Sequence, residues 1–278
     1  MRCELAAKYA AVEKRLTDLG SVLVAFSGGV DSAVVLVAAV RALGAQRVLA
    51  VTARSPSVPP ADLADATRLA GELGVGLELV DTGELENPRY ASNPPSRCYH
   101  CKAEVYGRLK QIAAARGLAA VVSGANADDL NDYRPGLQAG RELGVRAPLA
   151  EAGLTKSEVR ELAAALGLWV HDKPASPCLA SRVPYGQPIT AEKLRQISAA
   201  EALLRELGFR ECRVRHHGEL ARIEVPVAEV GRLVGGDLRQ LVDRELRELG
   251  FAYVTLDLRG FRSGSLNEVL ARGGGKSE

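Results

Sequence analysis

The fold of this chain is decided near its start by Val22-Leu23-Val24-Ala25-Phe26-Ser27-Gly28-Gly29-Val30-Asp31-Ser32. The apolar run before the first serine predicts a buried strand, and the apolar residues 33–43 predict a helix. A glycine-rich turn between a strand and a helix directs several backbone N–H groups and the positive end of the helix dipole at one point, which suits a phosphate. No lysine follows the glycines, so this is not the Gly-x-x-x-x-Gly-Lys-Ser/Thr loop that holds a departing γ-phosphate. The alternative is a tight turn without a ligand.

Length and composition narrow the class of protein. With 278 residues the chain can bury a sizeable core and form one large domain or two ordinary ones. A net charge of +2 argues against bulk nucleic-acid binding, although a local basic patch remains possible. The start resembles no signal peptide, and no apolar run approaches the ~20 residues that a membrane span needs. We therefore expect a cytoplasmic protein, not bound to a membrane, whose five cysteines are thiols or ligands rather than disulfides.

The first two thirds of the chain alternate short β-rich runs with helical patterns. The expected strands are Val22–Phe26, Arg47–Thr52, Gly76–Val80, Ala119–Ser123 and Ala147–Leu149. The expected helices are Ala6–Leu19, Asp31–Leu43, Ala61–Leu73, Glu104–Arg116 and Lys156–Leu166. Such alternation predicts an α/β domain with a doubly wound parallel sheet over residues 1–180. Ligands of such sheets lie outside the carboxyl ends of the strands, where the glycine-rich loop falls.

The pattern changes after a proline-rich stretch at residues 173–188, which we expect to be irregular. Beyond it, helical and alternating patterns follow at Lys193–Leu207, Glu211–His216, Arg222–Val225, Val227–Leu249 and Ala252–Leu258. These predict a smaller α/β domain over residues 188–270. The Gly-rich, charged residues 271–278 predict a disordered tail.

A second polar segment, Ser123-Gly124-Ala125-Asn126-Ala127-Asp128-Asp129-Leu130, closes the fourth expected strand. We expect it on the same rim of the sheet as the glycine-rich loop. Gly124 permits a close backbone approach, and the paired aspartates could hold Mg²⁺ through oxygen ligands. The alternative is that Asn126 or Asp128 only caps a helix. For the segment as a whole we favour function and assign Gly124, Asn126 and Asp129 to a cofactor site.

Three cysteines form a further candidate site. Cys98 and Cys101 make a Cys-x-x-Cys pair after a proline-rich loop, and Cys178 lies in the irregular stretch. The pair alone fits a redox couple, half a zinc site or coincidence. Zinc would need a fourth ligand, which His100 or His171 could offer. Three thiolates on loops suit instead a [4Fe–4S] cluster with one iron left open.

The remaining candidates lie in the C-terminal third. Cys212 alternates inward with Val214 and is interpreted as a core residue, whereas Cys3 lies in a terminus expected to fray. Arg213 and Arg215 lie two apart on a strand and therefore share a face, which suits bidentate phosphate binding. The alternative is a solvated face with cross-strand ion pairs. For Glu201, on the preceding helix, the alternative to a functional role is a simple exposed position on the surface.

Three segments together carry a family resemblance. Residues 27–32 resemble the PP-loop of the ATP pyrophosphatases. With Asn-Ala-Asp-Asp-Leu-x-Asp-Tyr-Arg-Pro-Gly (residues 126–136) and Pro-Cys-Leu-Ala-Ser-Arg-Val-Pro-Tyr-Gly (residues 177–186), they resemble the LarE proteins through nearly the whole chain. LarE proteins are ATP-dependent sulfur transferases that build the nickel-pincer nucleotide cofactor of lactate racemase. Within the second segment, Arg134 could bind a phosphate or lie on the surface.

The resemblance implies an activity and a set of ligands. ATP and Mg²⁺ would be bound by Ser27, Gly28, Gly29, Asp31 and Ser32, and the backbone near Ala53 would contact adenine. The substrate would be pyridinium-3,5-biscarboxylic acid mononucleotide, whose carboxylates are adenylated and then converted to thiocarboxylates.

The resemblance also implies roles for the cysteines and for the second domain. Cys98, Cys101 and Cys178 would hold a [4Fe–4S] cluster carrying an extra sulfide, as in three-cysteine members; simpler members sacrifice the sulfur of the cysteine that matches Cys178. The residues expected to bind the substrate phosphate or to lie beside it are Ser181, Arg182, Arg213 and Arg215, with Glu201 and Glu224 near the site. A homo-oligomer is expected.

Other functions share parts of this pattern. A PP-loop tRNA thiolation enzyme would need a basic or aromatic RNA surface, and only 4% of the residues are aromatic. An amide-forming PP-loop enzyme would have no use for three loop cysteines. A non-catalytic nucleotide or iron–sulfur carrier would not consume ATP when a substrate is added.

Overall fold

The computed structural model describes residues 2–131 and 135–262. They divide into two compact units, one formed by Met1–Tyr90 with Pro94–Ser176, the other by Ala91–Asn93 with Pro177–Glu278. The short piece Ala91–Asn93 belongs to the second unit because the Asn93 amide donates to the carbonyl oxygens of residues 183, 184 and 187. The predicted tail, residues 271–278, lies outside the described residues.

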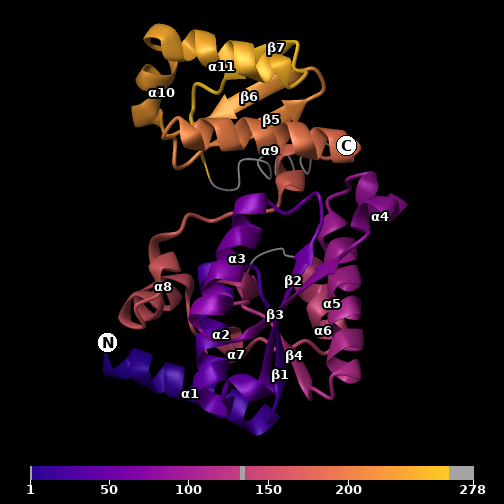
Figure 1. Ribbon diagram of the computed structural model, residues 1–278, viewed down its shortest axis with the longest axis vertical. Coiled ribbons are helices and arrows are strands. Elements are labelled where there is room, and N and C mark those ends of the chain that lie inside the picture. Colours follow the sequence, from indigo (N-terminus) through magenta and orange to yellow (C-terminus); the bar gives the residue numbers. More distant parts are fainter. Residues whose placement is uncertain (1, 132–134, 263–278) are drawn as a thin grey trace, which may run out of the picture. The chain divides into compact units, whose positions relative to one another are not determined.

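The first unit is built on a four-stranded parallel sheet in the order β3-β2-β1-β4 (Figure 1). Its strands are β1 (Val22–Ala25), β2 (Val48–Arg54), β3 (Gly76–Asp81) and β4 (Ala120–Val122). Because β2 and β4 lie on opposite sides of β1, the strand order reverses at β1, and the carboxyl end of β1 is the switch point at which such sheets bind ligands. The predicted doubly wound α/β class is confirmed.

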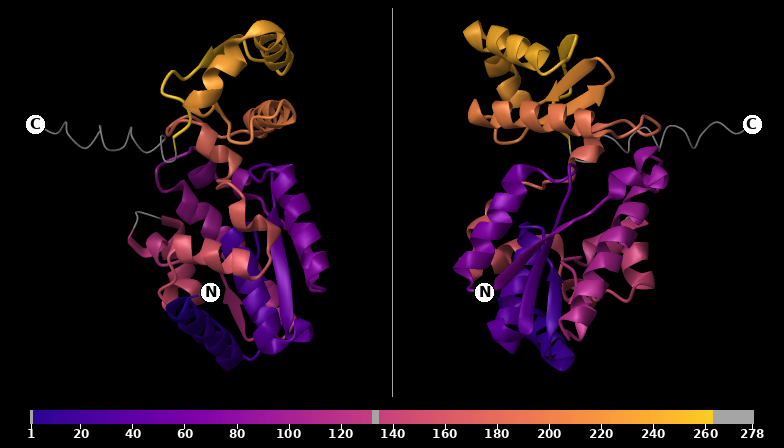
Figure 2. Two further views of the ribbon diagram at one scale, coloured as in Figure 1. Left: turned by 90° about the vertical axis from the view of Figure 1, so that its left-hand side faces the viewer. Right: turned by 45° about the vertical axis from the view of Figure 1, so that its right-hand side comes forward.

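Helices cover both faces of this sheet (Figures 1 and 2). The helices are α1 (Cys3–Leu19), α2 (Val30–Leu43), α3 (Pro60–Glu72), α4 (Pro88–Ala91), α5 (Arg97–Ala115), α6 (Pro135–Glu142), α7 (Pro148–Glu151) and α8 (Lys156–Ala165). Short 3₁₀ turns are η1 (Ala45–Arg47), η2 (Glu84–Glu86), η3 (Asp128–Asn131) and η4 (Trp169–Asp172). One core joins α1, α2, α3 and α8 to the sheet, and a second joins α5 to its other face. Helix α2 is buried along most of its length, which explains why its sequence is apolar all round.

Two predicted elements of the first unit are wrong in detail. The expected strand Ala147–Leu149 is only a single bridge between Val122 and Arg146, followed by α7. Pro148 has no N–H to donate to a strand, but it fits the first position of a helix. Helix α5 begins at Arg97 rather than Glu104. Its first buried apolar residue, Val105, comes about two turns after that start, so the apolar pattern placed the start too late.

The second unit contains a three-stranded mixed sheet in the order β5-β6-β7. Its strands are β5 (Arg213–His217), β6 (Leu220–Glu224) and β7 (Tyr253–Leu256), and its helices are η5 (Leu179–Arg182), α9 (Ala191–Glu206), α10 (Val227–Val234) and α11 (Gly236–Glu248). The hairpin β5–β6 is antiparallel and β7 joins β6 in parallel. The single helix predicted over Val227–Leu249 is interrupted at Gly235, whose backbone is extended. Across the described residues, no helix is long and apolar enough to span a membrane.

Candidate active site

The glycine-rich loop connects β1 to α2 and is closed by its own serines. The Ser32 hydroxyl donates to the Gly29 carbonyl at 3.0 Å and accepts from the Ser27 N–H at 3.2 Å. The two serine hydroxyls lie 3.2 Å apart. Gly28 has a φ of +70°, a backbone conformation that favours glycine. The loop is therefore held in one shape, with α2 beginning directly behind it.

Two glycines let other backbone segments come up against this loop. A Cβ at Gly28 would lie 2.9 Å from the backbone N of Ala66 and from the carbonyl O of Asp62, both on α3. A Cβ at Gly124, after β4, would lie 2.7 Å from the backbone N of Ser32. No side chain other than hydrogen fits at either place without moving backbone. The predicted close approach at Gly124 is thus explained by the first turn of α2.

Asp31, in the first turn of α2, gathers the polar residues that follow β4. Its Oδ1 accepts from the Asn126 amide at 3.2 Å, and its Oδ2 is paired with the ammonium of Lys156. The carboxylates of Asp128 and Asp129 accept backbone N–H bonds, from Lys156 at 2.8 Å and from Asn126 at 3.0 Å. Asp128 therefore accepts the first N–H of helix α8, while Asn126 contacts Asp31. The segment both caps a helix and lies against the glycine-rich loop.

Lys156 is a candidate that sequence reasoning missed. It is the first residue of α8, where Thr155 and Glu158 form a capping box. The pattern Thr-x-x-Glu is visible in the sequence and marks the start of a helix. What the pattern does not show is that this helix start faces Asp31.

The carboxyl end of β2 supports the loop from the side of the expected adenine contact. The buried Thr52 hydroxyl donates to the Phe26 carbonyl at 2.7 Å, directly before the loop. Ala53, the next residue, pairs with Val80 of β3. Beyond the strand, the buried Glu84 carboxylate accepts from hydroxyls that include those of Ser55 and Ser57.

Cys98 and Cys101 lie in the first two turns of α5, not on a loop as predicted from the sequence. Residues three apart share one side of a helix, so the two thiols face the same way. Both are at least partly exposed. A Cβ at Gly136, at the start of α6, would lie 3.4 Å from the Cys98 carbonyl, which places α6 close to this turn. Arg134, just before α6, lies outside the described residues.

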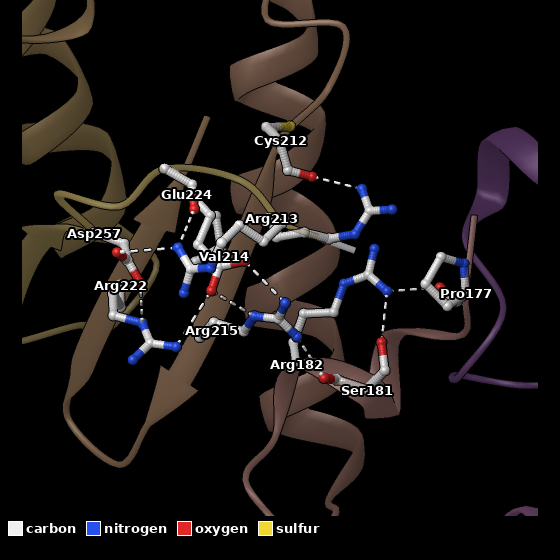
Figure 3. A network of polar contacts seen from close by, with 12 residues as sticks. Pro177, Ser181, Arg182, Cys212, Arg213, Val214, Arg215, Arg222, Glu224 and Asp257 are labelled. Carbon is white, nitrogen blue, oxygen red and sulfur yellow. Dashed lines mark hydrogen bonds and ion pairs between the residues drawn. The ribbon is translucent and has the colours of Figure 1, made fainter. Parts of the chain in front are cut away.

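In the second unit, Arg182 holds the turn that carries Cys178 by bonds that include those to Pro177 and Ser181 (Figure 3). Its guanidinium donates to the carbonyls of Pro177 at 2.6 Å and Cys178 at 3.1 Å and to the Ser181 hydroxyl at 2.8 Å. Its other edge forms two bonds with Glu201, at 2.8 and 2.9 Å. Arg182 and Glu201 are both 0% exposed. The alternative that Glu201 lies exposed on the surface is therefore wrong. In this structure Arg182 fixes the turn that contains Cys178.

Arg213 and Arg215 lie beside this anchor on β5. Arg215 forms two bonds with the buried Glu224, at 3.0 and 2.8 Å, and donates to the Ser181 carbonyl at 2.8 Å (Figure 3). Arg213 donates to the Cys212 carbonyl at 2.7 Å. Burial and, next, the positive charge of Arg182 lower the pKa of Arg213 to about 10. Burial and Arg182 thus disfavour the charged form of Arg213, and a nearby anion would favour it.

Cys212 behaves as a core residue, as predicted. It is 1% exposed, and burial, followed by the charge of Glu201, raises the pKa of its thiol to about 11. Such a thiol is a poor nucleophile and a poor metal ligand at neutral pH. Throughout residues 2–131 and 135–262, no three His, Cys, Asp or Glu side chains are arranged to hold a metal ion.

The parallel sheet and the loop after its first strand define a PP-loop, ATP-using protein. Residues 7–93 match the NAD synthase family. The chain is 45% identical over 268 residues, 96% of both proteins, to the pyridinium-3,5-bisthiocarboxylic acid mononucleotide synthase of Lactiplantibacillus plantarum. It therefore belongs to the LarE family of ATP-dependent sulfur-inserting enzymes.

Other relatives agree with this placement. An uncharacterized protein of Synechocystis sp. is 48% identical over 256 residues, 92% of this chain and 95% of that protein. The ammonia-dependent NAD+ synthetase of Pyrobaculum aerophilum is 33% identical over 167 residues, 57% of this chain and 61% of that protein. The match to the synthetase is partial, whereas the match to the synthase runs through both units.

Proposed function

We propose that this protein converts pyridinium-3,5-biscarboxylic acid mononucleotide to its bisthiocarboxylic form, a step in building the nickel-pincer nucleotide. The observation that carries this proposal is the 45% identity to the bisthiocarboxylate synthase over 96% of both chains. The closed PP-loop at the switch point of the sheet supports it, because sulfur insertion into a carboxylate needs prior activation by ATP.

The loop would bind the β- and γ-phosphates of ATP. Its backbone N–H groups, the hydroxyls of Ser27 and Ser32 and the start of α2 supply donors and positive potential for the charge that grows on departing pyrophosphate. Asp31 would hold Mg²⁺, since its carboxylate lies in the first turn of α2 and is partly exposed. The ammonium of Lys156, now paired with Asp31, would then be available to a phosphate oxygen.

The chemistry proceeds in two displacements for each carboxylate. A carboxylate oxygen of the substrate attacks the α-phosphorus of ATP, and pyrophosphate leaves with the electron pair of the broken P–O bond. An anionic sulfur then attacks the acyl carbon, and AMP leaves, so that one oxygen is replaced by sulfur. Activation is required because a free carboxylate is a poor electrophile, whereas an acyl-adenylate has a good leaving group.

The arginines of the second unit would bind the phosphate of the substrate nucleotide. Arg213 is the strongest candidate, because it lies on β5 beside Arg215, and burial and the positive charge of Arg182 disfavour its charged form. Arg215 would assist from the same face of β5. Arg182 would act indirectly, through Ser181 and the Cys178 turn that it holds.

Cys98, Cys101 and Cys178 would hold a [4Fe–4S] cluster, which would supply a sulfide as the sulfur donor. The donor set fits in part: two partly exposed thiols share one side of a helical turn, and thiolates are the ligands that such clusters use. The third thiol would be that of Cys178, on the turn that Arg182 holds. We also expect the chain to form a homo-oligomer.

The test combines activity with metal analysis. Protein purified without oxygen is incubated with substrate, ATP and Mg²⁺, and we expect pyrophosphate release that depends on substrate together with a thiocarboxylate product by mass spectrometry. Iron and acid-labile sulfide are measured in parallel, and we expect Cys98→Ala to lose both while Cys3→Ala, at the exposed N-terminus, keeps them. Active protein without iron would refute the cluster, and a mass loss of one hydrogen sulfide molecule would then identify Cys178 as the donor. Absence of a thiocarboxylate product would refute the function itself.

A further inference from the structure

Lys173, near the end of the first unit, contacts the glycine-rich loop (residues 27–32), called the phosphate loop from here on. The ammonium of Lys173 lies 2.6 Å from Asp65 Oδ2, 2.9 Å from Asp62 Oδ1 and 3.4 Å from the Gly28 carbonyl oxygen. Both aspartates lie on the first turns of α3, the helix on which Gly28 is packed. One side chain therefore touches the loop and the helix behind it.

The segment that carries Lys173 is held at several further points. Ser176 donates to Asp62 Oδ2 at 2.7 Å, so that both oxygens of Asp62 are used by this segment. On α8, Arg160 donates to the carbonyls of His171 at 2.7 Å and Lys173 at 2.8 Å. Residues 173–178 form no helix or strand. Side-chain bonds of this kind are thus what hold the segment in place.

Lys173 carries its charge although its side chain is largely buried. The Lys173 side chain is 17% exposed. Burial by itself would lower its pKa, but the hydrogen bonds and charges of Asp65 and Asp62 outweigh this and raise it above the ordinary value. The ammonium therefore remains charged throughout the neutral range and serves two carboxylates at once.

Chain connectivity extends this anchor to Cys178. Cys178 follows Ser176 by two residues, and two residues of fully extended chain span at most about 7 Å. Anchoring Ser176 beside α3 therefore limits how far the backbone of Cys178 can move from that point. The two prolines of the segment, Pro174 and Pro177, stiffen it further.

We infer that Lys173, with Asp62 and Asp65, is a positioning residue for the sulfur step: it holds residues 173–176, the last of the first unit before Cys178, against the phosphate loop and α3. This rests on the proposed function, in which Cys178 belongs to the sulfur-donating group. The ammonium of Lys173 contacts Asp62, Asp65 and the Gly28 carbonyl rather than Cys178. Lys173 contacts the loop at the Gly28 carbonyl and not at the N–H groups that would face a phosphate, so its removal should impair adenylation less than the transfer of sulfur to the adenylate.

The test separates the two half-reactions in Lys173→Met. Substrate-dependent exchange of labelled pyrophosphate into ATP reports adenylation, and thiocarboxylate formation reports the complete reaction. We expect exchange within about threefold of wild type and product formation reduced at least tenfold. Lys14→Met is the matched control, because Lys14 also pairs with an aspartate, Asp18, but on an exposed face of α1. A loss of exchange equal to the loss of product, or no loss of either, would overturn the inference.

A second measurement does not depend on the substrate. The rate at which iodoacetamide alkylates Cys178 is followed by peptide mass spectrometry in iron-free wild type and variants, because a bound cluster would protect the thiols, with Cys98 of the first unit as internal reference. We expect Cys178 to react at least fivefold faster in Lys173→Met and the reaction of Cys98 to change less than twofold. Asp65→Asn, which leaves Lys173 and Asp62 in place, should shift the rate in the same direction by less. An unchanged Cys178 rate in a folded variant would overturn the anchor, whereas failure of wild type to perform substrate-dependent exchange would count against the proposed function alone.

Discussion

Substitution of Gly124 by alanine should damage the phosphate loop without removing any polar group. The added Cβ would lie 2.7 Å from the backbone N of Ser32 and 2.9 Å from the carbonyl carbon of Asp31, so it meets backbone that cannot rotate away. Inserting one methyl group into a tightly packed place costs about 1–3 kcal/mol. For a unit of this size that corresponds to a fall in Tm of roughly 2–12 °C. If the strain is relieved by displacing the loop, the same free energy would appear as roughly a 5- to 150-fold loss of ATP affinity.

The assay is thermal unfolding together with ATP binding by calorimetry, and the chain offers a matched control. Gly107 lies within α5 and has nothing within 4 Å of the place its Cβ would occupy. Gly107→Ala should therefore leave ATP binding unchanged and raise stability by about 0.5–1 kcal/mol, because alanine favours a helix over glycine. If Gly124→Ala binds ATP as tightly as wild type and unfolds at the same temperature, the packing argument is refuted.

Three further predictions concern the second unit. Glu201→Ala should leave the Arg182 charge buried without its partner and cost about 3–5 kcal/mol, measured by chemical denaturation; a cost below about 1 kcal/mol would contradict this. Burial, followed by Lys193, lowers the pKa of His216 below its ordinary value of 6.5, so the unfolded chain binds the proton more tightly and this contribution to stability is present above about pH 6.5 and lost as pH falls through the folded-state pKa. Unfolding titrations should show it, and an identical pH profile in His216→Gln would argue against it. Cys212 should resist iodoacetamide at pH 8 in the folded protein and react only on unfolding, which mass spectrometry would detect.

The pattern of apolar and polar residues along the chain predicted most of the strands and helices. The apolar run before Ser27 and the alternation of strands with helices predicted the parallel sheet, since a strand buried on both faces must be apolar throughout. The inward position of Cys212 was predicted because residues alternate between inward and outward along β5, and Cys212, just before the strand, alternates with the inward Val214. The errors fell where the local signal was weak: the start of α5 carries no apolar periodicity, and Gly235 interrupts a helical pattern that otherwise continues.

By itself the sequence determined the class of fold, the phosphate loop and the family, because these depend on residue types at fixed spacing along the chain. The tertiary structure alone decided which distant groups meet: Lys156 with Asp31, Lys173 with Asp62 and Asp65. It also decided that Glu201 is buried against an arginine rather than exposed. The reason is that such charged residues have the same local pattern on a solvated face as in an ion pair. Only the packing that removes them from water makes a partner necessary.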